Sequence, residues 1–165
     1  MSNILMLANQ LGEHLKAYSM KVTTAESCTG GGVAQAITMV PGSSSWFELG
    51  VVSYSNLVKQ QQLDVDPAIL TKHGAVSEPV VKAMVSGVLK IANADVGVAV
   101  SGIAGPGGGS PEKPVGSVWF AWQLATGISV TAYHRFTGDR EAVRQQAVEV
   151  ALVGLIKIIE DNVDS

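Results

Sequence analysis

The chain has 165 residues, of which 47% are hydrophobic and 15% are charged, and its formal net charge is −3 at pH 7. This length and composition predict one globular domain, residues 1–165, and exclude a disordered chain. The acidic balance excludes a nucleic-acid partner, because phosphate binding needs clustered positive charge. A single cysteine cannot form an internal disulfide and no apolar run is long enough for a membrane span, so we expect a cytoplasmic protein without a membrane partner.

The first half of the chain alternates between helical and strand-like patterns. Apolar residues at helical spacing predict a helix over 3–17, and "KVTTAE", residues 21–26, predicts a short strand. "SCTGGG" then predicts a tight glycine turn before a helix over 33–40. "FELGVVSYS", residues 47–55, predicts a second strand, which is followed by a short helix over 56–62 and a turn at "DVDP".

The second half adds a buried strand and a hairpin. Ser77 and Pro79 predict the start of a helix that continues through "VVKAMVSGVLKIA". "DVGVAVSG" has the continuous apolar character of a strand that is buried on both faces. After the glycine-rich loop "GIAGPGGGSPEKP", two strands joined near Thr126 and Gly127 predict a β-hairpin. A long helix follows, with Asp139 at its positive end.

Strands separated by helices, with one hairpin, predict an α/β fold. We expect a three-layer α/β/α sandwich with a mixed, mostly parallel central sheet that includes the hairpin. Ligands bind in such folds where loops leave the carboxyl ends of strands. Three loops meet this description, and they follow Glu26, Tyr54 and Ser101.

The stretch "TTAESCTGGG" places two candidate nucleophiles side by side. Ser27 would face free N–H groups at the start of a helix, which could stabilise an oxyanion. The spacing alone favours a simpler role for Ser27 as the helix N-cap. Cys28 would be reactive if the helix N-terminus lowered the pKa of its thiol, and inert if it packed into the core.

A serine nucleophile needs a base, and no histidine is an obvious partner. Lys59 follows the second strand in the apolar stretch "NLVKQ", and it could act as the base if burial lowered its pKa from about 10.4 toward about 7 or 8. Otherwise it is an ordinary exposed lysine. Tyr54, at the end of the same strand, could hydrogen-bond Ser27 or Lys59, or be structural.

The glycine-rich stretch, Arg140 and the histidines bear on ligand binding. The stretch "GIAGPGGG" offers backbone N–H groups that can approach an anion closely. Arg140 could bind a phosphate, or it could pair on the surface with Asp139 or Glu141. The histidines show no metal-ligand spacing, so we expect neither a metal ion nor another cofactor.

Six blocks of sequence resemble a known family. In order they are "TTAESCTGG", "PGSSSWFELGVVSYSNLVK", "HGAVSE", "SGIAGPGGG", "KPVGSVWFAW" and "GDREAVR", and they resemble the CinA C-terminal-domain family, specifically its stand-alone nicotinamide-nucleotide amidases, over residues 5–155. The resemblance implies hydrolysis of nicotinamide mononucleotide to nicotinate mononucleotide and ammonia in pyridine-nucleotide salvage, by a metal-free serine and lysine mechanism. The alternative from another class is a non-catalytic nucleotide-binding or regulatory module.

The resemblance also implies roles for individual residues. By position, Ser27 is the nucleophile, Lys59 the base and Tyr54 the assisting tyrosine. It places a hydroxyl residue before the glycine loop at Ser101 and the phosphate-side arginine at Arg140. The full set of substrate-binding residues that we expect lies in the two glycine-rich segments and at the start of the last helix, and it consists of Cys28, Thr29, Gly30, Gly31, Ser101, Gly102, Gly105 and Arg140. It further favours a homodimer or a higher homo-oligomer.

Overall fold

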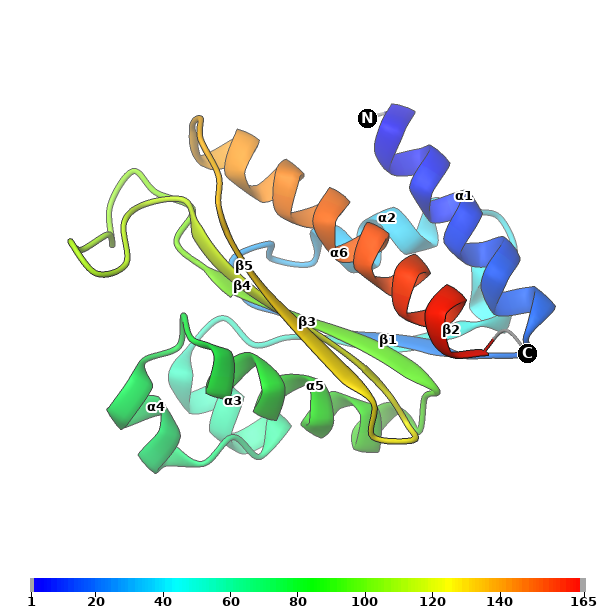
Figure 1. Cartoon of the computed structure of the whole chain (residues 1–165), viewed down its shortest axis with the longest axis horizontal. Coiled ribbons are helices and arrows are strands. Elements are labelled where there is room, and N and C mark those ends of the chain that lie inside the picture. The colour runs from blue at the N-terminus through cyan, green and yellow to red at the C-terminus, as the bar shows by residue number, and fades with distance from the viewer. Residues whose placement is uncertain (1, 164–165) are drawn as a thin grey trace.

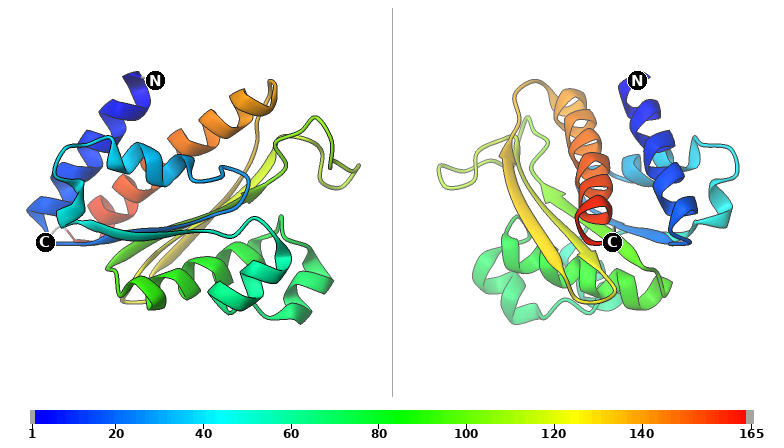
Figure 2. Two further views of the ribbon diagram at one scale, coloured as in Figure 1. Left: turned by 180° about the vertical axis from the view of Figure 1, so that it is seen from behind. Right: turned by 45° about the vertical axis from the view of Figure 1, so that its right-hand side comes forward.

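The computed structural model describes residues 2–163, in which a five-stranded sheet lies between two layers of helices (Figure 1). The strands are β1 (Val22–Glu26), β2 (Phe47–Val52), β3 (Val96–Gly102), β4 (Ser117–Leu124) and β5 (Ser129–Arg135). The helices are α1 (Ser2–Ala17), α2 (Gly32–Thr38), α3 (Asn56–Leu63), α4 (Pro67–His73), α5 (Glu78–Ala92) and α6 (Arg140–Val163), with a 3₁₀ helix η1 at Ser43–Ser45. Figure 2 shows α1, α2 and α6 on one side of the sheet and α3, α4 and α5 on the other, which confirms the predicted three-layer sandwich.

The strand order of the sheet is β2-β1-β3-β4-β5. β1 pairs in parallel with both β2 and β3, whereas β4 is antiparallel to both of its neighbours. Four strands therefore run in one direction and β4 runs in the other, as expected for a mixed sheet with one hairpin. Because β1 lies between β2 and β3, the carboxyl ends of these three strands meet at one edge, the usual place for a ligand site in an α/β fold.

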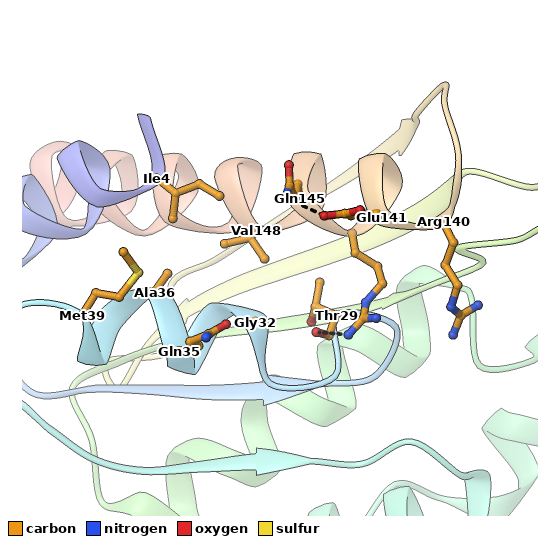
Figure 3. A pocket seen from close by; sticks show the side chains of 11 residues that line it. Ile4, Thr29, Gly32, Gln35, Ala36, Met39, Arg140, Glu141, Gln145 and Val148 are labelled. Carbon is orange, nitrogen blue, oxygen red and sulfur yellow. Dashed lines mark hydrogen bonds between the residues drawn. The ribbon is translucent and has the colours of Figure 1, made fainter. Parts of the chain in front are cut away.

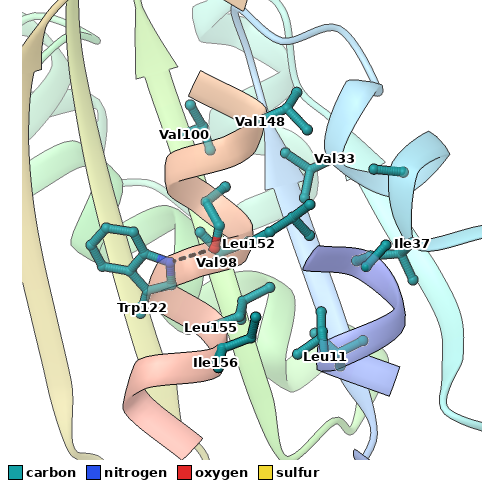
Figure 4. Packing of buried hydrophobic residues seen from close by; sticks show 14 of the residues in the cluster. Leu11, Val33, Ile37, Val98, Val100, Trp122, Val148, Leu152, Leu155 and Ile156 are labelled. Carbon is teal, nitrogen blue, oxygen red and sulfur yellow. Dashed lines mark hydrogen bonds between the residues drawn. The ribbon is translucent and has the colours of Figure 1, made fainter. Parts of the chain in front are cut away.

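The two faces of the sheet carry different side chains. Val98 and Val100 of β3 face Leu152 of α6 in a buried cluster, where Trp122 Nε1 donates a hydrogen bond to the Ala151 carbonyl at 3.0 Å (Figure 4). The opposite face, beneath α5, carries a row of alanines in register, Ala25, Ala99 and Ala121. These small side chains let α5 pack close to the sheet. No helix among residues 2–163 has the length and apolar character needed to cross a bilayer.

Two details differ from the sequence-based expectations. "DVDP" starts helix α4 rather than forming only a turn, because the Asp66 carboxylate accepts a hydrogen bond from the Ala68 N–H at 2.9 Å and Pro67 occupies the first helical turn. β2 ends at Val52, so Tyr54 lies in the loop after the strand. This loop brings Tyr54 to the edge of the sheet where β1 also ends.

Candidate active site

Ser27 directly follows β1 and begins a turn that leads into α2. The N-cap of α2 is Gly31, whose φ of 101° is a backbone conformation that glycine adopts readily. Gly31 has no side chain with which to cap the helix, and the Ser27 hydroxyl does not cap it either. The expectation that Ser27 serves only as a helix N-cap is therefore wrong.

Glu26 organises this turn, a role that the sequence reasoning missed. Its fully buried carboxylate accepts three hydrogen bonds, from the Thr29 hydroxyl at 2.6 Å, the Val33 N–H at 2.8 Å and the Ala34 N–H at 3.0 Å. The two N–H groups belong to the first turn of α2, where backbone donors have no partner within the helix. An acidic residue just before a helix start was the available signal, because negative charge is stabilising there.

The turn still leaves backbone donors free beside Ser27. Gly30 N–H donates to the Ser27 carbonyl and Gly32 N–H donates to the Thr29 carbonyl, both at 3.0 Å. The N–H groups of Cys28 and Thr29 have no acceptor within residues 2–163. Any oxyanion donors therefore come from the turn itself, because Glu26 already occupies the first N–H groups of α2.

Lys59, from α3, reaches the same point from the other side. Its side chain is only 1% exposed, and its Nζ lies 3.0 Å from Ser27 Oγ and 2.7 Å from the Ser53 carbonyl oxygen. Lys59 belongs to none of the ion pairs found within residues 2–163. Burial without a carboxylate partner disfavours the ammonium form, which lowers the pKa of Lys59 from 10.5 to about 8.

These contacts orient the Lys59 amine toward Ser27. The Ser53 carbonyl can only accept, so Lys59 donates one N–H to it. A neutral amine keeps a lone pair, which can accept the proton of the Ser27 hydroxyl. Ser27 and Lys59 therefore have the geometry of a nucleophile and its base.

Cys28 lies in a different environment from its neighbour. Its side chain is buried in the core between the sheet and α1, α2 and α6. Burial, with a smaller contribution from the nearby Glu26 carboxylate, raises the pKa of the thiol to about 12. A thiol in this state is protonated at neutral pH and is not a nucleophile, which agrees with the core-packing alternative.

A cavity of about 210 Å³ opens at Ser27. The lining residues come from the ends of β1, β2 and β3, from α3, from the loop before α5 and from the start of α6, and they are Ser27, Cys28, Tyr54, Asn56, Lys59, Ala75, Val76, Ser101, Gly102, Ala104 and Arg140. Asn56, Ala75, Val76 and Ala104 were not among the predicted residues, although all four lie within the blocks that resemble the CinA family. No group of three or more His, Cys, Asp or Glu side chains in the described part of the chain is placed to hold a metal ion.

Tyr54 and Arg140 contact each other at the rim of this cavity. Arg140 donates one hydrogen bond to the Tyr54 hydroxyl and another to the Gly105 carbonyl, both at 2.8 Å. Tyr54 is 59% exposed, and within residues 2–163 no hydrogen bond joins it to Ser27 or Lys59. The alternative of a surface pair between Arg140 and Asp139 or Glu141 is wrong, because the guanidinium is directed to the glycine loop and to Tyr54.

Four predicted binding residues lie outside the lining of the cavity at Ser27. Gly30 and Gly31 form the turn behind Ser27, and Gly105 contributes its carbonyl to Arg140. Thr29 lines a second, larger cavity of about 540 Å³ between α1, α2 and α6 (Figure 3). Arg140 lines both cavities, so they adjoin at this residue.

The chain matches the sequence profile of the CinA C-terminal domain over residues 5–159. It belongs to this family. The nicotinamide-nucleotide amidohydrolase PncC of Pseudomonas putida is 56% identical over 159 residues, which are 96% of this chain and 98% of that protein. The protein of the same name from Escherichia coli K12 is also 56% identical, over 92% of each chain.

Solved structures of the family have the same fold. A CinA superfamily protein from Klebsiella pneumoniae superposes with a TM-score of 0.92 at 40% identity, over 96% of this chain and 98% of that one. The competence/damage inducible protein of Agrobacterium tumefaciens gives a TM-score of 0.93 at 40% identity, over 94% and 95%. These matches confirm the family resemblance and the α/β fold expected from the sequence.

Proposed function

We propose that this chain hydrolyses the carboxamide of nicotinamide mononucleotide to nicotinate mononucleotide and ammonia. The observation that carries the proposal is the 3.0 Å contact between Lys59 Nζ and Ser27 Oγ in a buried site. Relatives that match almost the full chain at 56% identity and are named nicotinamide-nucleotide amidohydrolase support this substrate. The proposal includes a cytoplasmic location, as expected from the sequence, and the homodimer or higher homo-oligomer that the family resemblance favours.

In the first half of the reaction, Ser27 becomes acylated. Neutral Lys59 accepts the Ser27 proton as Oγ attacks the carboxamide carbon. The N–H groups of Cys28 and Thr29 stabilise the oxyanion that forms. Protonated Lys59 then gives its proton to the amide nitrogen, assisted by Tyr54 at the cavity rim, and the C–N bond breaks to release ammonia.

In the second half, water removes the acyl group. Lys59, neutral again, accepts a proton from the water as its oxygen attacks the ester carbon. The ester bond to Ser27 breaks, and Lys59 returns the proton to Oγ. Ser101 and Gly102, on the wall of the cavity formed by the end of β3, bind the nicotinamide portion during both halves.

Variants of the two adjacent residues test the nucleophile. We expect Ser27→Ala to lower ammonia release from nicotinamide mononucleotide by about a thousandfold or more, because it removes the attacking oxygen. Cys28→Ala is the matched control and should keep most of the activity, because the buried thiol takes no part. Circular dichroism checks that both variants fold.

Two outcomes would overturn the proposal. One is full activity in Ser27→Ala. The other is a wild-type protein that binds the nucleotide but releases no ammonia over a long incubation, which is the behaviour of a non-catalytic nucleotide-binding module.

A further inference from the structure

The cavity at Ser27 is small for a nucleotide. Small-molecule sites usually occupy about 300–1,000 Å³, so the 210 Å³ cavity lies below that range and the adjoining 540 Å³ cavity lies within it. Figure 3 shows Arg140 at one end of the larger cavity, with Ile4 and Met39 at the other end. A ligand that places a carboxamide at Ser27 therefore extends past Arg140 into the larger cavity.

The end of the larger cavity near Arg140 carries two arginine side chains, and neither is engaged in an ion pair within residues 2–163. Arg140 and Arg144 lie one helical turn apart on α6, and both line the cavity. Like charges four residues apart destabilise a helix by about 0.2–0.5 kcal/mol, so an anionic ligand would relieve a real repulsion.

Arg144 is held next to the turn that carries Ser27. Its guanidinium donates one hydrogen bond to the Thr29 carbonyl at 3.2 Å, which leaves further N–H donors without a protein partner. A Cβ atom on Gly30 would lie 2.8 Å from an Arg144 terminal nitrogen, so a side chain at this position would displace the guanidinium from the turn. Arg144 thus lies between the turn that follows Ser27 and the larger cavity.

We propose that the Arg140 end of the larger cavity binds the phosphate of the nucleotide and that Arg144 recognises this phosphate. The guanidinium of an arginine offers paired N–H donors that match phosphate oxygens. The inference rests on the proposed function, because it assigns the part of that substrate beyond the nicotinamide ring. Sequence reasoning did not select Arg144, and in the structure it is the arginine in contact with the Ser27 turn.

Glu141 supplies the opposite charge in the same cavity. Its exposed carboxylate lines the cavity one helical position after Arg140, and it accepts only a long 3.5 Å hydrogen bond from Gln145. A phosphate beside it would be repelled. Neutralising Glu141 should therefore strengthen phosphate binding, whereas neutralising Arg144 should weaken it.

Binding to the inactive Ser27→Ala protein tests this assignment without turnover. Titration calorimetry compares nicotinamide mononucleotide with nicotinamide riboside, which lacks the phosphate. In this background we expect Arg144→Gln to raise the Kd of the mononucleotide by about 10- to 100-fold, the usual loss for a charged hydrogen bond, and to leave that of the riboside within about twofold. Arg144→Lys should recover part of the loss, and Glu141→Gln should lower the Kd of the mononucleotide by a few-fold.

Arg135→Gln, on the exposed edge strand β5, is the control and should change neither affinity. Equal weakening of both ligands by Arg144→Gln would overturn the inference, because it would show that Arg144 only supports the Thr29 carbonyl. Equal affinity of the unsubstituted Ser27→Ala protein for both ligands would also overturn it. A phosphate-dependent Kd together with a wild-type protein that releases no ammonia would support this inference and refute the proposed function, so the two can be separated.

Discussion

Glu26 and Lys59 are two buried ionisable side chains beside Ser27, and they differ in their partners. The Glu26 carboxylate accepts three hydrogen bonds from a hydroxyl and two backbone N–H groups. The Lys59 amine contacts only a carbonyl and the Ser27 hydroxyl. Burial is therefore compensated at Glu26 by hydrogen bonds from the protein, whereas at Lys59 it lowers the pKa of the amine because no carboxylate within residues 2–163 pairs with it.

The position of each residue in the fold explains the difference. Glu26 ends β1, directly opposite the unpaired N–H groups at the start of α2. Lys59 lies inside α3, in the connection after β2, and the nearest acceptor is the Ser53 carbonyl. The Glu26 carboxylate thus ties the turn to α2, whereas the lysine that faces the turn has no carboxylate partner within residues 2–163.

The largest effect is expected from removing the base. Lys59→Met keeps a long apolar side chain but cannot accept the Ser27 proton, so kcat/KM for nicotinamide mononucleotide should fall by about 10²–10⁴-fold. Initial rates of ammonia release near pH 8 measure this. Lys72→Met, at an exposed position of α4, should leave the rate unchanged. A loss of less than tenfold in Lys59→Met would show that another group activates Ser27.

Removal of the Glu26 carboxylate should lower the stability of the protein. Glu26→Ala leaves three buried or partly buried donors without an acceptor, so the free energy of unfolding should fall by more than about 3 kcal/mol in urea titrations. Glu48→Ala breaks a surface pair with Lys21 at 3.0 Å and should cost less than about 1 kcal/mol. Similar losses in the two variants would refute the anchoring role of Glu26.

The difference in the free energy of unfolding between Lys59→Met and wild type should change with pH. Below pH 8 both folded and unfolded wild-type chains carry a charged Lys59, and the folded state bears the full cost of burying it, up to about 3 kcal/mol. Between pH 8 and 10.5 the folded state releases this proton first, so that cost disappears. The stability of the variant relative to wild type should therefore be greater at pH 7 than at pH 10, and a constant difference in urea unfolding would contradict the lowered pKa.

The sequence predicted the parts of this site that depend on local patterns. The apolar run of β3 and the turn at Gly127 marked a buried strand and a hairpin, and both are confirmed. Asp66 before Pro67 was also a local helix-start signal, but it was interpreted as a turn. Such signals depend only on neighbouring residues, which is why they can be read without the fold.

The contacts that form the candidate active site join residues far apart in the sequence. Ser27 and Lys59 are 32 positions apart, and only the placement of β1 beside β2 brings them together. The residues alone therefore offered this pair only as one alternative, and the family resemblance made it the favoured one. The partners of Glu26 lie up to eight residues further along and depend on the shape of the glycine turn. Arg144 meets the turn from 115 positions away, through the packing of α6 against α2.

The pH dependence of kcat/KM for nicotinamide mononucleotide tests the central claim, that a neutral Lys59 activates Ser27. The range from pH 6.5 to 9.5 keeps the nucleotide phosphate mostly dianionic, since the second pKa of a phosphate ester is about 6. Because the pKa of Lys59 is lowered to about 8, kcat/KM should rise about tenfold per pH unit and level off above pH 8, with a value at pH 6.5 about thirtyfold below the plateau. A profile that is flat over this range would contradict the claim.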